Sequence, residues 1–169
     1  MKNENKTKKL TTIASLVALS MVLSYLESLI PPLVAVPGVK IGLANIITVF
    51  SLYLLDAKSA ILISLLRVCL SSLLFGNTVS FIYSLSGALL SYLVMLLLLR
   101  LDFFSEIGVS VSGGVAHNVG QVAAAAVVMQ NSGLLYYIAP LLISGSLAGV
   151  AVGIIAALAI RRLRGKINK

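Results

Sequence analysis

Long apolar segments run through almost the whole chain, and they decide what it can fold into. Six can be delimited, at 10–30, 41–55, 60–75, 79–99, 107–129 and 138–160. A helix needs about 20 mainly apolar residues to cross a bilayer, so the second and third segments must borrow flanking residues or run short. Charged residues make up only 11% of the chain, against about 25% in soluble domains. The sequence therefore predicts an all-α membrane protein, with residues 1–169 forming one bundle of six transmembrane helices.

The basic residues are unevenly distributed between the links of these segments. The formal net charge of +8 would suit nucleic-acid binding. If the N-terminus is cytoplasmic, however, eleven Lys and Arg residues fall in the inner tails and links, and only Lys40 falls outside. This asymmetry follows the positive-inside rule. We therefore expect both termini in the cytoplasm, short basic tails at 1–9 and 161–169, contact with anionic lipid, and no nucleic-acid partner.

The first outer link differs from the short polar turns elsewhere. Residues 31–40 hold three prolines and a glycine but are mainly apolar. Irregular backbone is tolerated at membrane depth only where protein or water covers it. We expect this loop to cap a cavity, with a plain surface turn as the alternative. Directly after it, Lys40, Gly42 and Asn45 bring a cation, a glycine and an amide to the mouth of a helix, which predicts a solute site there.

Arg67 lies near the middle of the third segment. A lone guanidinium at that depth costs at least about 2.5–3.5 kcal/mol, so it needs water or a partner. Two partners fit the sequence, Glu27 in the outer third of the first segment and a bound anionic solute.

The fifth segment carries a polar, glycine-rich stretch at 112–121. His117, Asn118 and Gln121 are one, three and four residues apart, so we expect them to share one face of a helix. Interhelical hydrogen bonds are one explanation. Three adjacent polar side chains favour the other, a lined cavity.

Small residues indicate where helices meet. Gly145, Gly149 and Gly153 recur every four residues on the last segment, a spacing that allows close helix packing. Ala14 and Ala18 form a similar small face near the cytoplasmic end of the first segment. By spacing alone, that pair predicts packing only.

The sequence predicts no enzyme activity. Magnesium-dependent prenyl-diphosphate chemistry needs clustered carboxylates, whereas Asp56 and Asp102, the only aspartates, are far apart in sequence. Ser112 and His117 are five residues apart and point away from each other on a helix, which leaves Ser110 and Ser144 as remote candidates for a nucleophile. One histidine and one cysteine are too few ligands for a metal site, and no cofactor is expected. The chain also has no phosphate-binding loop with its lysine, so any ATPase would be a separate subunit.

These features together resemble the Gx transporter family, whose members are often labelled heptaprenyl diphosphate synthase component I. The resemblance rests on the six-segment layout, the Ala14/Ala18 pair, the first outer loop and the motifs at 40–45 and 113–121. The wider relatives are the substrate-binding S components of energy-coupling factor (ECF) transporters. Like them, the chain is expected to be a multi-pass protein of a bacterial cell membrane.

The resemblance also implies a function. It implies an outward-facing pocket for a small polar or anionic solute, such as a vitamin, a flavin or an isoprenoid, lined by Lys40, Asn45, Arg67, His117, Asn118 and Gln121. It further implies that Ala14 and Ala18 meet a coupling subunit served by separate ATPases. Two alternatives stay open at this point: an accessory membrane subunit of polyprenyl diphosphate or quinone synthesis, and a structural subunit of a redox or flavin-attachment complex.

Overall fold

The computed structural model describes residues 2–29 and 42–167, with side chains described for 6–29 and 42–163. These ranges form six α-helices and one 3-10 helix and contain no strand. The elements are α1 (Lys2–Ser28), α2 (Asn45–Leu54), α3 (Ala57–Phe75), α4 (Thr78–Leu101), α5 (Glu106–Val128), η1 (Ser132–Tyr137) and α6 (Ile138–Ile167). Lys40 and the rest of the predicted capping loop lie outside the described residues.

Side-chain caps explain where three of the helices begin. The Asp56 carboxylate accepts a hydrogen bond from the Ser59 N–H before α3, and the Asn77 side chain accepts one from the Ser80 N–H before α4. Ser105 caps α5 in the same way, through the Gly108 N–H. Each cap pairs a backbone donor that the first helical turn leaves unpaired. The short polar links therefore terminate the apolar segments where the sequence places them.

The predicted all-α bundle of apolar helices is confirmed, but the second helix is short. Within residues 2–29 and 42–167, five helices are long and apolar enough to cross a membrane. In contrast, α2 has only 10 residues and is about 15 Å long, half the thickness of a bilayer core. It begins at Asn45 rather than Ile41, because Gly42 has a φ of +92°, which a helix does not allow.

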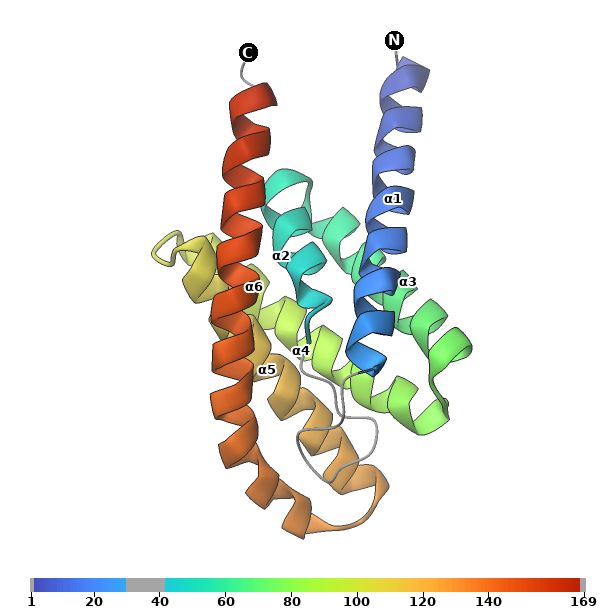
Figure 1. Cartoon of the computed structure of the whole chain (residues 1–169), viewed down its shortest axis with the longest axis vertical. Helices are drawn as coiled ribbons and strands as arrows, with labels where there is room; N and C mark the ends of the chain where they lie inside the picture. Colours follow the sequence, from blue (N-terminus) through green and yellow to red (C-terminus); the bar gives the residue numbers. More distant parts are fainter. Residues whose placement is uncertain (1, 30–41, 168–169) are drawn as a thin grey trace.

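Both chain ends lie at one end of the bundle, here called the terminal end (Figure 1). The links after α2 and α4 face this end, and those after α3 and α5 face the opposite end. The described parts of the predicted basic tails belong to α1 and α6, which extend past the other helices. Since α2 covers only the terminal half, its first residue, Asn45, lies about halfway along the bundle.

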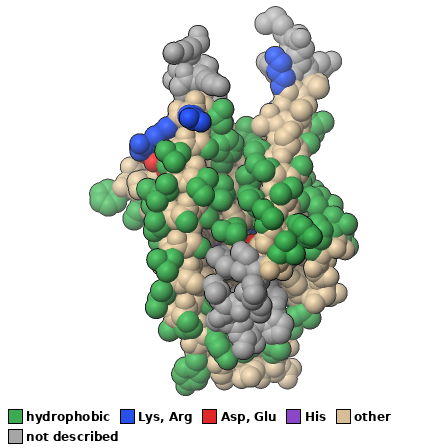
Figure 2. Space-filling model, in the orientation of Figure 1, with side chains coloured by type: hydrophobic (Ala, Val, Ile, Leu, Met, Phe, Trp, Pro, Cys, Tyr) green, Lys and Arg blue, Asp and Glu red, His purple; other side chains and the backbone are tan. Residues whose placement is uncertain are grey.

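The exterior is suited to lipid. Large hydrophobic side chains are exposed along α3 and α4, including Leu73 at 81% and Leu97 at 60%. On the face viewed in Figure 2, hydrophobic side chains cover much of the bundle, and Lys and Arg side chains lie near the terminal end. Apolar groups exposed on this scale are covered by a membrane rather than by water.

An apolar core fills the terminal half of the bundle. Each of the five helices α2, α3, α4, α5 and α6 contributes to it. The buried side chains are Val49, Leu52, Ala60, Tyr92, Met95, Val109, Ala156 and Ile160. The Tyr92 hydroxyl donates to the Ala57 carbonyl at 2.9 Å, so the polar atom within this core is paired. We call this set the terminal core.

Candidate functional site

A buried carboxylate holds the start of α2. Glu27, one residue before the end of α1, is 4% exposed. Its Oε1 accepts hydrogen bonds from the backbone N–H groups of Gly42 and Leu43. The positive φ of Gly42 belongs to the turn that presents these two donors. A charge-assisted pair of this kind fixes the chain entering α2 against α1.

Arg67 lies on α3, a helix that packs against α1, within electrostatic range of this carboxylate. The guanidinium is 4% exposed and interacts electrostatically with Glu27. Among the described residues, however, its Nε and Nη2 atoms have no hydrogen-bond partner. Glu27 was one of the two partners expected from the sequence, and the charge interaction agrees with it. This charge interaction leaves part of the arginine's hydrogen-bonding capacity unused.

His117 and Gln121 of α5 belong to the same group of buried polar side chains as Glu27 and Arg67. Both are buried, at 2% and 0% exposure. A Cβ added to Gly42 would lie 3.2 Å from His117 Cδ2, and one added to Gly87 of α4 would lie 2.8 Å from Gln121 Cγ. Two glycines therefore leave the space that these side chains occupy. The turn at Gly42 therefore contacts both Glu27 of α1 and His117 of α5.

The two asparagines have different surroundings. Asn45 opens α2 close to Gly42, and its Nδ2 atom has no partner within the described part of the chain. Asn118 instead donates from Nδ2 to the Leu141 carbonyl of α6 at 2.8 Å. The face-sharing expected for the α5 residues therefore holds for His117 and Gln121, whereas Asn118 turns toward α6.

We refer to Glu27, Gly42, Asn45, Arg67, His117 and Gln121 as the polar cluster. It lies at mid-depth, where α2 begins, and the terminal core separates it from the terminal end. Sequence reasoning placed Asn45, Arg67, His117 and Gln121 in a site. It missed Glu27 as the residue that holds the Gly42 turn, because nothing in the local sequence shows that residues 27 and 42 meet.

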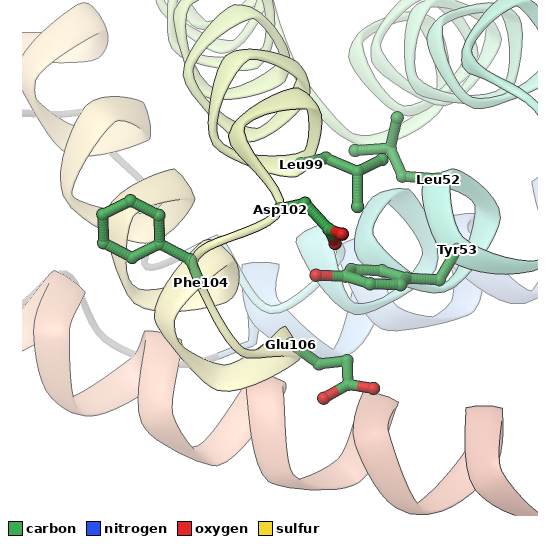
Figure 3. A pocket seen from close by; sticks show the side chains of 6 residues that line it. All are labelled: Leu52, Tyr53, Leu99, Asp102, Phe104 and Glu106. Carbon is green, nitrogen blue, oxygen red and sulfur yellow. The ribbon is translucent and has the colours of Figure 1, made fainter.

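Apart from the polar cluster, a cavity of about 410 Å³ opens near the terminal end (Figure 3). It is lined by Leu52, Tyr53, Leu99, Asp102, Phe104 and Glu106. The Asp102 carboxylate points toward Tyr53, while Glu106 points away from both (Figure 3). No group of three or more His, Cys, Asp or Glu side chains that could hold a metal ion occurs in the described ranges.

The glycine stripe of α6 faces α5. A Cβ added to Gly145, Gly149 or Gly153 would lie 2.6 to 2.8 Å from an atom of α5. The corresponding atoms are Asn118 Nδ2, Val111 Cα and Ile107 Cα. These distances are closer than real Cβ atoms approach, so the two helices are in contact through their backbones.

Ala14 and Ala18 lie on the outside of the bundle. Both are exposed on α1, whose buried side, with Leu16 and Val17, packs against Ile47 and Ile63. In the described part of the chain α1 contacts only α2 and α3. The small-residue face of α1 is therefore not used for packing among the described residues.

Comparisons with known proteins identify the fold and the family. No curated protein sequence matches the chain. Among solved structures, the S component of a bacterial ECF transporter is similar at a TM-score of 0.61 and 16% sequence identity, with 97% of this chain and 99% of that chain covered. At this identity the match establishes a shared fold. A family model described as heptaprenyl diphosphate synthase component I matches residues 16–159, and the chain therefore belongs to the heptaprenyl diphosphate synthase component I family.

Proposed function

We propose that this protein is the solute-binding membrane subunit of a small-molecule transporter. The observation that carries the proposal is the polar cluster, a set of buried charged and amide side chains at mid-depth of a membrane bundle. Polar groups at this depth are costly and are typical of substrate pathways. The S-component fold supports the same assignment, since the similar structure belongs to an ECF transporter.

A solute would reach the proposed site from one side of the membrane only. The terminal core closes the bundle toward the end that carries the basic tails. By the positive-inside rule that end is cytoplasmic, so the polar cluster would be reached from outside. Lys40, at the end of the loop that precedes Gly42, is proposed as a further contact to the solute. Asn118 would support the site by holding α5 to α6.

Transport by this chain would need a separate energy source. We propose an ECF-type coupling subunit with its ATPases as the partner, and Ala14 and Ala18 as the surface that receives it. Both alanines are exposed on a helix face that contacts nothing within the described bundle. A flat face of small residues allows another helix to approach closely in a membrane.

Bound solute can be detected directly. Protein purified from its native membrane should carry a small molecule that native mass spectrometry releases and identifies. Asn45→Ala should reduce its retention about 5- to 30-fold, because the free Nδ2 donor is lost while no protein hydrogen bond of that atom is broken. Ser86→Ala, which removes an exposed hydroxyl of α4, is the control. An equal loss of bound solute in both variants, or the absence of a bound molecule from every preparation, would contradict the proposal.

Coupling can be tested separately. Ala14→Trp should abolish co-purification with a coupling subunit and leave solute retention unchanged, because the pocket lies near the other end of α1. Leu26→Trp places the same bulk on an exposed position of α1 close to the opposite end and should leave the complex intact. Unchanged complex formation in Ala14→Trp would reject this surface.

The second candidate is an accessory membrane subunit of polyprenyl diphosphate or quinone synthesis. The description of the family favours it. It predicts a stable complex with a soluble prenyl diphosphate synthase, and higher synthase activity when the membrane subunit is present. Affinity purification followed by a product assay distinguishes this candidate from the transporter.

A further inference from the structure

One edge of the Arg67 guanidinium is left open. The Nε–H and one Nη2–H bond run parallel along the same side of this planar group, and neither nitrogen has a hydrogen-bond partner among the described residues. Two parallel donors of this kind match the two oxygens of a carboxylate or a phosphate. In a buried position, unmade hydrogen bonds of a charged group are costly.

Glu27 does not use this edge. Its Oε1 already accepts from two backbone donors, Gly42 and Leu43, and its influence on Arg67 is a charge interaction. The carboxylate therefore has partners that do not depend on the arginine. The arginine in turn keeps a bidentate donor site that no described protein group fills.

The other atoms without partners in this region can add to the same site. Asn45 Nδ2 is a further donor, while the hydroxyls of Ser24 and Ser64 can donate or accept. Ser24 lies one turn before Glu27 on the buried side of α1, and Ser64 lies one turn before Arg67 on the buried side of α3. The cluster also holds the Glu27 carboxylate, an acceptor whose negative charge interacts with the positive charge of Arg67. Apart from this carboxylate, the guanidinium edge, the asparagine amide and the two hydroxyls offer mainly donors, and their complement is a group rich in acceptors.

We infer that the polar cluster binds an organic anion through an oxyanion, a carboxylate or a phosphate, held by the Nε–Nη2 edge of Arg67. This inference rests on the proposed function and names the class of solute for the same site. A neutral solute would leave the bidentate edge only partly paired, so the charged group should decide whether a molecule binds. Free carboxylates, free phosphates and lipid phosphates share this chemistry.

Matched probes separate the oxyanion from the rest of a molecule. Benzoate and benzamide differ only in the charged group, as do phenyl phosphate and phenol. In nanodiscs of neutral phosphatidylcholine, benzoate or phenyl phosphate should raise the thermal unfolding temperature, and the neutral probes should not. Added phosphatidylglycerol tests a lipid phosphate in the same assay. Stabilisation by that lipid alone would assign the oxyanion to a headgroup. Equal effects of charged and neutral probes, or no effect of any oxyanion, would overturn the inference.

Variants locate the effect. Arg67→Gln should weaken the affinity for benzoate about 10- to 100-fold. Arg67→Lys should recover only part of this affinity, because an ammonium group does not present two parallel N–H donors in one plane. Arg161→Gln, at the terminal end of α6, is the matched control. An oxyanion response that persists in Arg67→Gln would contradict the assignment.

A measurement on the unchanged protein covers the case in which Arg67 variants do not fold. With ¹⁵N-labelled arginine, one Nε–H resonance should shift and exchange more slowly with water when benzoate or phenyl phosphate is added. If no arginine resonance responds, the inference fails. If a neutral small molecule is nevertheless found bound in native preparations and is lost in Asn45→Ala, the proposed function stands without it.

Discussion

The contact between α5 and α6 gives the most direct test of the packing described above. A Cβ added to Gly149 would lie 2.6 Å from Val111 Cα and 3.1 Å from the Ser110 carbonyl oxygen. Both are backbone atoms, so no side chain can move aside. The first distance is about 0.8 Å below the 3.4 Å at which ordinary contact begins. Gly149→Ala must therefore push the two helices apart.

The expected cost follows from two opposing effects. Overpacking of a tight contact costs about 1–3 kcal/mol, whereas alanine in place of glycine within a helix stabilises by about 0.5–1 kcal/mol. Because the added methyl would meet backbone atoms, the overpacking cost should lie in the upper part of its range, about 2–3 kcal/mol. The net result should then be a loss of about 1–2 kcal/mol in the free energy of unfolding. Gly108→Ala on α5 is the matched control, because its Cβ would meet Phe104 Cδ1 at an ordinary 3.5 Å.

The assay is reversible unfolding of the purified protein in mixed micelles, followed by circular dichroism. Gly149→Ala should unfold more readily than the unchanged protein, and Gly108→Ala should be as stable or slightly more stable. If Gly149→Ala is as stable as the parent, or if both variants lose the same stability, the helices do not meet through their backbones as described.

Three further predictions concern other parts of the molecule. Hydrogen bonds from Lys9, 2.7 Å away, and from the N–H and hydroxyl of Ser59 lower the pKa of Asp56 from 3.8 to about 2. Asp56→Asn should therefore reduce stability above pH 4 by about 0.2–1 kcal/mol. In a pH series of thermal unfolding, this difference should vanish as the pH falls to about 2. Asn118→Ala breaks the bond to the Leu141 carbonyl and should lower unfolding stability by about 0.6–2 kcal/mol, and unaltered unfolding would show that the bond is not formed. In a variant lacking the native cysteine, a cysteine in place of Asn77 should react with an impermeant maleimide added to intact cells, and labelling at position 3 instead would reverse the proposed orientation.

The sequence was sufficient to predict most helix boundaries, because residues at the boundaries themselves determine them. Asp56, Asn77 and Ser105 are recognisable caps that follow apolar segments. The length of α2 could not be predicted in the same way, since residues 41–44 are apolar enough to continue a helix. What starts the helix later is the positive φ of Gly42, whose N–H is held by Glu27. That contact depends on the tertiary fold and has no local signal.

The site was predictable in composition but not in arrangement. Polar residues within apolar segments identified Asn45, Arg67, His117 and Gln121 as candidates. Spacing along one helix could not show that Asn118 donates to α6 while its neighbour His117 lies against Gly42. The spacing of the α6 glycines likewise predicted a contact stripe without naming α5 as its partner.

A density map of the protein purified from its native membrane would show whether the polar cluster holds a solute. We expect density for a small molecule between α1, α3 and α5, within hydrogen-bonding distance of the Nε and Nη2 atoms of Arg67 and close to Asn45. A map in which Arg67 instead pairs through both nitrogens with protein groups, with no room for a molecule beside it, would contradict this expectation.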